Sequence, residues 1–256
     1  MTTLAIIGGT GLTRMEGLTV TRREMVKTPF GAPSCPIVFG ELGGRSVAFL
    51  ARHGSAHRIP PHQVNYCANI WALNSVGITR IIALGAVGGI HKDCEVGSIV
   101  VPDQIIDYTH ARENTFFDGG EDPVQHIDFS YPYNASLRET IIKGARDTKD
   151  TEGRSVTVID NGVYGVTQGP RLETAAEIRR MANDGCTIVG MTGMPEASLA
   201  AELGIDYACC AMVINYAAGI NGQPVDTAAL PNAIQSIMSN AKQVLIQSLQ
   251  EPGLLE

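Results

Sequence analysis

Four basic side chains stand within seven residues of this sequence, in the segment Arg52-His53-Gly54-Ser55-Ala56-His57-Arg58. Arg52 could hold a phosphate through the paired donors of its planar guanidinium, and His53 could add one more donor. The segment directly follows the apolar, strand-like run Ser46–Ala51, and ligands of open α/β sheets bind beyond strand ends. The pattern therefore predicts an anion-binding loop, with a solvated basic turn as the alternative.

A glycine-rich turn near the start of the chain favours the same kind of ligand. The stretch Ala5-Ile6-Ile7-Gly8-Gly9-Thr10-Gly11-Leu12 is an apolar run that ends in glycines and a threonine. It does not fit the dinucleotide pattern G-x-G-x-x-G, because Arg14 stands where the last glycine would fall. Free backbone N–H groups and the hydroxyl of Thr10 suit a single phosphate. An ordinary tight turn is the alternative.

Two later strand-like runs end in small or hydroxyl residues. One ends in Leu84-Gly85-Ala86-Val87-Gly88-Gly89-Ile90, where small residues would let the backbone approach a ligand closely. The other, Thr187–Met191, is followed by Thr192 and by a helix that we expect to begin at Pro195. Together with the two segments above, they give four strand ends with groups that suit phosphate.

The elements that would position these groups alternate between strand-like and helix-like runs, which predicts one α/β domain with a sheet flanked by helices. The strand-like runs are Leu4–Ile7, Pro36–Phe39, Ser46–Ala51, Arg80–Leu84, Ser98–Val101, Ser155–Val158, Thr187–Met191 and Tyr207–Ile214. The helix-like runs are His62–Val76, Asn134–Asp147, Glu173–Asn183, Pro195–Leu203 and Thr227–Gln250. The segment Asp107–Tyr133 is irregular, and such a long loop is usually functional or mobile.

Composition limits the possible partners. The 256 residues are 44% hydrophobic and 18% charged, with a formal net charge of -7 and no Lys/Arg-rich block, which argues against nucleic acid. No apolar run reaches the roughly 20 residues of a membrane span, and no basic leader precedes the first strand. The six cysteines lack the C-x-x-C spacing of zinc or redox motifs, and Cys209-Cys210 lies in an apolar run. We therefore expect a soluble, cytoplasmic protein with buried free cysteines.

Taken together, several segments resemble the trimeric nucleoside phosphorylases, and most of all their methylthioadenosine phosphorylase branch. The resemblance runs in order from residue 4 to about residue 219. It is carried by Ile6–Gly11, Thr28–Ser34, Ala51–Gly54, Val64–Leu73, Gly169-Pro170-Arg171 and Met191-Thr192. It implies a mixed sheet that closes partly into a barrel, a homotrimer with sites near subunit interfaces, and attack of inorganic phosphate on the anomeric carbon of a purine nucleoside. Phosphate would be a co-substrate, with no cofactor, no metal and no covalent intermediate.

The resemblance also implies roles for individual residues. Met191 would lie against the sugar, with His57 near the phosphate and the ribose, and Leu172 would line the substrate pocket. Gly85 departs from the branch, which has a threonine there whose hydroxyl helps to hold phosphate. The residues expected to bind phosphate are Thr10, Arg52, His53, Ala86 through its backbone, and Thr192.

The base-binding positions also depart from the methylthioadenosine branch. That branch has two aspartates where this sequence has Asn215 and Ala217. A carboxylate only accepts hydrogen bonds, whereas an asparagine amide both donates and accepts. Asn215 could therefore donate to O6 of a 6-oxopurine while its carbonyl accepts from a protonated N7.

Glu173 favours the same base. It stands where 6-oxopurine phosphorylases have a glutamate that accepts the N1–H of hypoxanthine or guanine. Adenine has no hydrogen at N1, so a carboxylate facing it would lack a donor, and such mismatches discriminate strongly. The alternative for Glu173 is an acid in the first turn of a helix.

The substituent at the 5′ position of the nucleoside is predicted from the absence of a histidine. Phosphorylases of inosine and guanosine place a histidine against the 5′-hydroxyl, and residues 216–249 contain none. Small apolar residues up to Leu230 suit a thioether instead. We expect phosphorolysis of 5′-methylthioinosine, with inosine and guanosine, or methylthioadenosine, as alternative substrates. A nucleoside hydrolase and a non-catalytic purine sensor are disfavoured by Arg52, His53 and Thr192.

Overall fold

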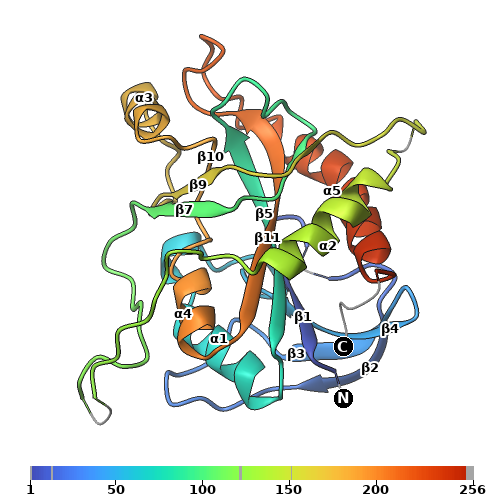
Figure 1. The fold of residues 1–256 in the computed structure, drawn as a ribbon, viewed down its shortest axis with the longest axis vertical. Coiled ribbons are helices and arrows are strands. Elements are labelled where there is room, and N and C mark those ends of the chain that lie inside the picture. The colour runs from blue at the N-terminus through green and yellow to red at the C-terminus, as the bar shows by residue number, and fades with distance from the viewer. Residues whose placement is uncertain (1, 13, 121–122, 151, 252–256) are drawn as a thin grey trace.

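A computed structural model describes residues 2–12, 14–120, 123–150 and 152–251, and it shows a mixed α/β fold around one branched sheet (Figure 1). The strands are β1 (Leu4–Gly8), β2 (Thr19–Glu24), β3 (Ile37–Leu42), β4 (Arg45–Ala51), β5 (Arg80–Gly89), β6 (Ile99–Val100), β7 (Gln104–Asp107), β8 (Val158–Ile159), β9 (Val163–Val166), β10 (Ile188–Gly190) and β11 (Asp206–Tyr216). Within the described residues, no helix is long and apolar enough to cross a membrane.

All five predicted helices are present, and a side chain caps the start of the first three. They are α1 (Tyr66–Ser75), α2 (Ala135–Arg146), α3 (Ala175–Asn183), α4 (Glu196–Glu202) and α5 (Leu230–Ser248). The first begins later than predicted because Pro61–Gln63 forms a separate turn, and Asn65 then caps α1 by accepting from the N–H of Ala68. Thr174 and Glu177 form a capping box at the start of α3. Glu173 therefore lies outside the helix that was predicted to begin with it.

The sheet is mixed, as expected, and the described strands do not close it into a complete barrel. Its main path runs β2-β3-β4-β1-β5-β10-β9-β7, and β11, β6 and β8 branch from β5. β1 pairs in parallel with both β4 and β5, β11 runs parallel to the whole of β5, and β10 meets the end of β5 antiparallel. The long strands β5 and β11 cross the centre of the molecule (Figure 1).

Strand β5 corrects one prediction. We expected it to end near Leu84 and to be followed by a loop of small residues, but it continues through Gly89. The small residues instead allow close packing. A Cβ on Gly88 would lie 3.2–3.4 Å from Val189 of β10 and from Ala217, which follows β11, and a Cβ on Gly89 would lie 3.2 Å or less from Cys94 and from Val213 of β11. The pocket-forming residues 85–88 are thus part of a rigid strand.

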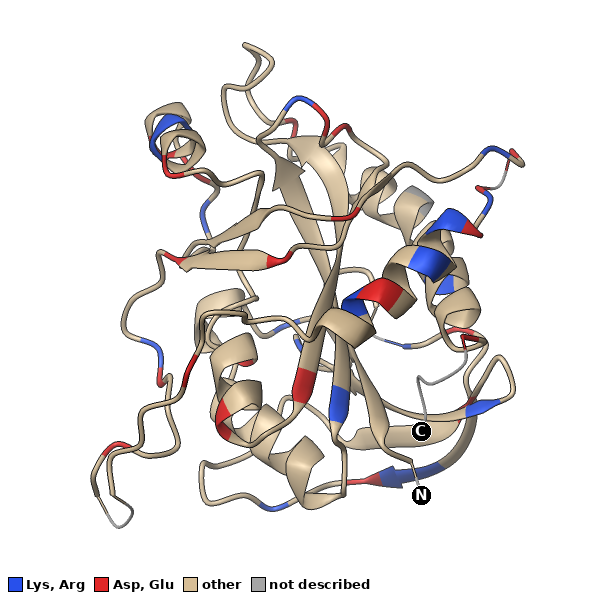
Figure 2. Ribbon diagram, in the orientation of Figure 1, with Lys and Arg blue, Asp and Glu red and all other residues tan. Residues whose placement is uncertain are grey.

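Apolar residues of β1, β5 and β11 are a central part of the core. Along the ribbon, the charged residues lie mainly in loops, in helices and near the ends of strands (Figure 2). All six cysteines are free and buried, as predicted, with Cys209 and Cys210 in the middle of β11. The strands β2, β7 and β9 were not predicted. β2 is mostly exposed and polar, and β7 and β9 are only four residues each.

The described part of the predicted irregular segment, which omits residues 121–122, contains no helix and no strand beyond Asp107. It is nevertheless attached to the body of the protein. Arg112 donates to the backbone carbonyls of Thr167, Gln168 and Met194. Further along, Glu202 of α4 accepts from the hydroxyl of Thr115. These hydrogen bonds fix part of the segment to the residues that follow β9 and to α4 and the residues just before it.

Candidate active site

A cavity of about 370 Å³ lies beside residues 85–88 of β5, close to the ends of three other strands. The parallel strands β1 and β4 end there at Gly8 and Ala51, and β10 arrives from the opposite direction and ends at Gly190. This volume is typical of small-molecule pockets. All twelve residues predicted for the site line it: Thr10, Arg52, His53, His57, Ala86, Leu172, Glu173, Met191, Thr192, Asn215, Ala217 and Leu230.

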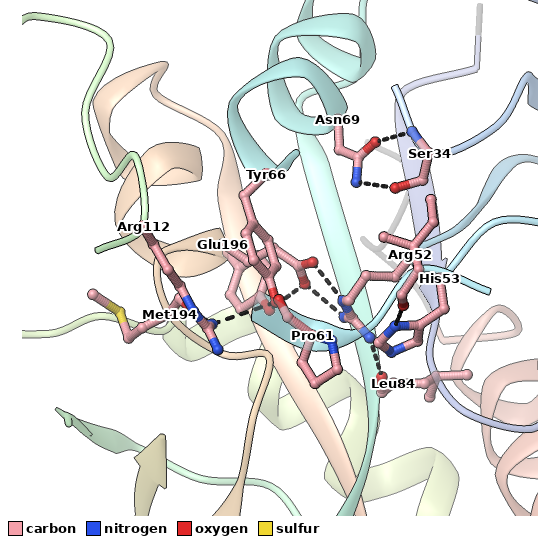
Figure 3. A network of polar contacts seen from close by, with 12 residues as sticks. Ser34, Arg52, His53, Pro61, Tyr66, Asn69, Leu84, Arg112, Met194 and Glu196 are labelled. Atoms are coloured by element: carbon pink, nitrogen blue, oxygen red, sulfur yellow. Dashed lines mark hydrogen bonds and ion pairs between the residues drawn. The ribbon is translucent and has the colours of Figure 1, made fainter. Parts of the chain in front are cut away.

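Arg52 is the fixed charge of the cavity. Its side chain is 1% exposed, and its Nε and Nη2 donate to the two carboxylate oxygens of Glu196, both at 2.6 Å (Figure 3). Nη1 donates to the carbonyl of Leu84 at 3.0 Å. Burial alone would lower the pKa of Arg52, but the adjacent carboxylate outweighs it and raises that pKa above its usual value. Since a guanidinium has five N–H groups, two remain for a ligand.

His53 is held in one tautomer, which corrects its expected role as a donor. Its Nδ1 lies 2.8 Å from the carbonyl oxygen of Ile59, and because a carbonyl only accepts, Nδ1 carries the hydrogen (Figure 3). Burial, and then the charge of Arg52, lower the pKa of His53 to about 4. The ring is therefore neutral at pH 7, and its Nε2 offers a lone pair. A hydrogen phosphate could donate its hydroxyl to that nitrogen.

The glycine turn packs tightly beside Arg52. A Cβ on Gly9 would lie 2.6 Å from the carbonyl oxygen of Leu84 and 3.1 Å from Nη1 of Arg52, so only glycine fits without displacement. This packing places the next residue, Thr10, at the cavity wall. Gly85 is different, because a Cβ there would have no neighbour closer than 3.8 Å.

A carboxylate and an amide lie further along β5. Asn215 is paired with Gly88, four residues beyond Leu84, which corresponds to roughly 13 Å along a strand. The Nδ2 of Asn215 donates to the carbonyl of Tyr216 at 2.7 Å, which leaves its second amide hydrogen and its carbonyl oxygen. Glu173 accepts from the hydroxyl of Thr167 at 2.6 Å and belongs to no helix, so the first-turn alternative does not apply.

The rest of the cavity wall consists mainly of apolar residues, with His57 at an exposed position. Ala217 belongs to a small buried cluster with Ile178, Met181 and Val189, so an aspartate in its place would lose water without gaining a partner. His57 is exposed, has a φ of 50°, and its ring centre lies 4.9 Å from that of His53. The other predicted apolar residues at the cavity are Leu172, Met191 and Leu230.

Sequence reasoning missed Glu196, the partner of Arg52. Its side chain is fully buried, and it also accepts from the hydroxyl of Tyr207 at 2.8 Å. A signal existed, since Glu196 is an acid in an otherwise small and apolar helix start, and buried acids need partners. The sequence pattern of this region predicts a ligand contact for Thr192 and a helix start at Pro195, but no role for Glu196; α4 begins at Glu196, one residue after the predicted Pro195.

No group of three or more His, Cys, Asp or Glu side chains that could hold a metal ion occurs among the residues that the structure describes. The fold and cavity define an α/β protein with a buried guanidinium at one part of a deep pocket and hydrogen-bonding groups for a polar ring at another. The chain belongs to the phosphorylase superfamily, whose sequence model matches residues 3–250.

Individual relatives are similar along nearly the whole chain. A probable S-methyl-5′-thioinosine phosphorylase of Pseudomonas syringae pv. tomato is 51% identical, over 97% of this chain and 99% of the relative. The 6-oxopurine nucleoside phosphorylase of Pyrococcus furiosus is 42% identical, over 97% and 92%. Among solved structures, the methylthioadenosine phosphorylase from Schistosoma mansoni in complex with tubercidin has a TM-score of 0.86 and 31% identity, covering 97% of this chain and 90% of that one.

Proposed function

We propose that this protein phosphorolyses 5′-methylthioinosine to hypoxanthine and 5-methylthioribose 1-phosphate. The observation that carries the proposal is that Glu173, with its carboxylate, and Asn215, with its amide, both line the cavity. The carboxylate can accept the N1–H of a 6-oxopurine, and the free amide hydrogen can donate to O6. The 51% identical relative named as a probable S-methyl-5′-thioinosine phosphorylase supports the same substrate.

Phosphate would bind at the other part of the cavity. The two free N–H groups of Arg52 and the hydroxyls of Thr10 and Thr192 donate to its oxygens, and the backbone of Ala86 contributes a further contact. The lone pair on Nε2 of His53 accepts the hydroxyl of hydrogen phosphate. His57, beside this ring, faces the phosphate and the ribose.

In the reaction, a phosphate oxygen forms a bond to C1′ as the bond from C1′ to N9 breaks with its electron pair on the purine. The transition state has a cationic sugar between two anions, which a positioned phosphate and a hydrogen-bonded base stabilise. N7 of the departing purine anion takes up a proton from solvent water, and the resulting N–H donates to the carbonyl oxygen of Asn215. Met191 lies under the sugar, and the methylthio group rests against Leu230 and its apolar neighbours.

Two alternatives concern the same reaction with other nucleosides. A phosphorylase of inosine or guanosine would share the oxopurine pocket, and the Pyrococcus furiosus relative is named for that class. A methylthioadenosine phosphorylase would share the apolar 5′ region, as the solved Schistosoma mansoni structure is of that enzyme. Apolar Val225, Leu230 and Ile234 at the cavity favour a methylthio group over a 5′-hydroxyl.

The decisive assay compares initial rates with methylthioinosine, methylthioadenosine and inosine, each with and without phosphate. We expect methylthioinosine to give the highest kcat/KM and no base release without phosphate. Faster turnover of methylthioadenosine would refute the oxopurine assignment, and phosphate-independent release would indicate a hydrolase.

The proposal includes a homotrimer located in the cytoplasm, with no cofactor and no metal requirement. The cytoplasmic assignment is supported by six free, buried cysteines. Sedimentation should give three chains per particle. Dialysis against a chelator should leave phosphorolysis unchanged.

A further inference from the structure

Thr167 is the residue directly after β9, and its backbone is fixed from both sides. Its N–H donates to the carbonyl of Gly190, at the end of β10, at 2.8 Å. Its own carbonyl accepts from Nη2 of Arg112 at 3.2 Å. The same guanidinium group also holds the next residue, Gln168, through its carbonyl and its side chain. The side chain of Thr167 therefore leaves a rigid support.

That side chain points its hydroxyl at Glu173. The Oγ1 of Thr167 lies 2.6 Å from Oε1 of Glu173 and 3.3 Å from the carbonyl oxygen of Gly190. A hydroxyl has one hydrogen, so it can serve only one of these oxygens fully. The shorter contact, to a carboxylate, is the stronger hydrogen bond.

This bond determines what Glu173 can offer to a ligand. The Thr167 hydroxyl occupies Oε1. Within the part of the chain that the structure describes, no hydrogen bond to Oε2 is formed, and Glu173 lines the cavity. Oε2 is therefore the oxygen left to accept a hydrogen bond from a ligand.

We infer that Thr167 is a positioning residue for base selection, which holds the Glu173 carboxylate in one orientation so that its second oxygen accepts the N1–H of a 6-oxopurine. This inference rests on the proposed function. Selectivity for the purine would then depend on the hydrogen-bonded pair Thr167 and Glu173, of which only Glu173 would contact the base. Without the hydroxyl, the carboxylate loses its only hydrogen bond within the described residues and is free to rotate away from the base.

The test measures kcat and KM for methylthioinosine and for methylthioadenosine in the whole enzyme and in three variants. Thr167→Val removes the hydroxyl but keeps the shape, and Thr167→Ser keeps the hydroxyl. Thr187→Val is a matched control, since the Thr187 hydroxyl donates only to the Val163 carbonyl at 3.3 Å, in the same region but away from Glu173.

We expect Thr167→Val to lower kcat/KM for methylthioinosine about tenfold or more, the loss typical of one hydrogen bond to a charged group. The kcat/KM for methylthioadenosine should fall less or rise. The ratio of kcat/KM for methylthioinosine to kcat/KM for methylthioadenosine should therefore decrease about tenfold. Thr167→Ser and Thr187→Val should keep the wild-type preference. In a Glu173→Gln background, Thr167→Val should add little, because the bond it removes no longer holds a carboxylate.

Two results would overturn the inference, and they differ in what they say about the function. If the wild type prefers methylthioinosine and Thr167→Val keeps that preference, the role of Thr167 is refuted and the proposed function stands. If the wild type prefers methylthioadenosine, both fail. Near-ultraviolet circular dichroism of each variant verifies that the fold is intact. If Thr167→Val does not fold, the test depends on Thr167→Ser, which keeps the hydroxyl. A Thr167→Ser enzyme that folds normally but has lost the preference for methylthioinosine would also refute the inference.

Discussion

Replacing Glu196 with glutamine should strongly destabilise the folded protein. The carboxylate accepts two hydrogen bonds of 2.6 Å from Arg52 and one of 2.8 Å from Tyr207, and all three side chains are buried. A glutamine amide keeps one acceptor oxygen but turns an NH₂ group toward donors, and the guanidinium keeps its charge without a counter-charge. Removing one partner of a buried ion pair typically costs about 3–5 kcal/mol.

Urea unfolding, followed by circular dichroism at one protein concentration and without phosphate, measures this free energy. For a domain of this size the loss corresponds to a fall in Tm of roughly 6–20 °C. The control is Glu139→Gln, which breaks an exposed ion pair with Lys143 at 3.1 Å and should cost less than about 1 kcal/mol. If Glu196→Gln unfolds like this control, the pair does not stabilise the fold as argued.

A double variant separates stability from function. Changing Arg52 to methionine together with Glu196 to leucine removes both charges, and apolar replacements of buried pairs are often neutral or stabilising. We expect this variant to be more stable than Glu196→Gln and to lack phosphorolysis. Full activity would refute the role of Arg52 in binding phosphate. Stability below that of Glu196→Gln would refute the claim that the unpaired charge causes the loss.

Three further predictions concern the base, the pH and Gly85. Asn215→Asp with Glu173→Ser should shift preference toward methylthioadenosine, and an unchanged substrate ratio would place selectivity elsewhere. The pKa of His53 falls from 6.5 to about 4 on folding, so between about pH 6.5 and pH 4 the unfolded chain binds a proton at His53 that the folded chain does not. The free energy of unfolding should therefore fall by about 2 kcal/mol from pH 7 to 5, and His53→Gln should lack this contribution. Gly85→Thr should fold normally and lower the KM for phosphate several-fold, because its Cβ would meet no atom closer than 3.8 Å and its hydroxyl adds a donor; an unchanged KM would contradict this.

The parts of the site that could be predicted from the sequence are local ones. Thr10 and Arg52 each stand directly after an apolar run, and such runs become buried strands whose ends are set by the chain itself. The continuation of β5 and the antiparallel arrival of β10 could not be predicted, because strand pairing depends on segments about a hundred residues apart. Local patterns contain no such information.

The same limit explains why the ion pair of Glu196 and the position of Glu173 outside α3 could not be predicted. The partner of Glu196 is 144 residues away, so its burial could only be inferred from its apolar neighbours. Glu173 lies two residues before α3, and helix ends are the least certain part of any sequence reading. Its hydrogen bond with Thr167 depends on how the intervening turn folds back, which composition does not specify.

The arrangement of charges suggests why the site is built before any ligand binds. Glu196 neutralises Arg52, which allows a guanidinium to be buried at the cavity that Arg52 lines, with two of its N–H groups unused by the described residues. In the proposed reaction, an incoming phosphate would meet donors that are already oriented, and little reorganisation would be needed. At the other part of the pocket, Ala217 keeps the surroundings of the base apolar, so Glu173 and Asn215 act in a medium where hydrogen bonds are stronger. Because an unmatched polar edge is costly in such a medium, a small number of groups is sufficient to discriminate between purines.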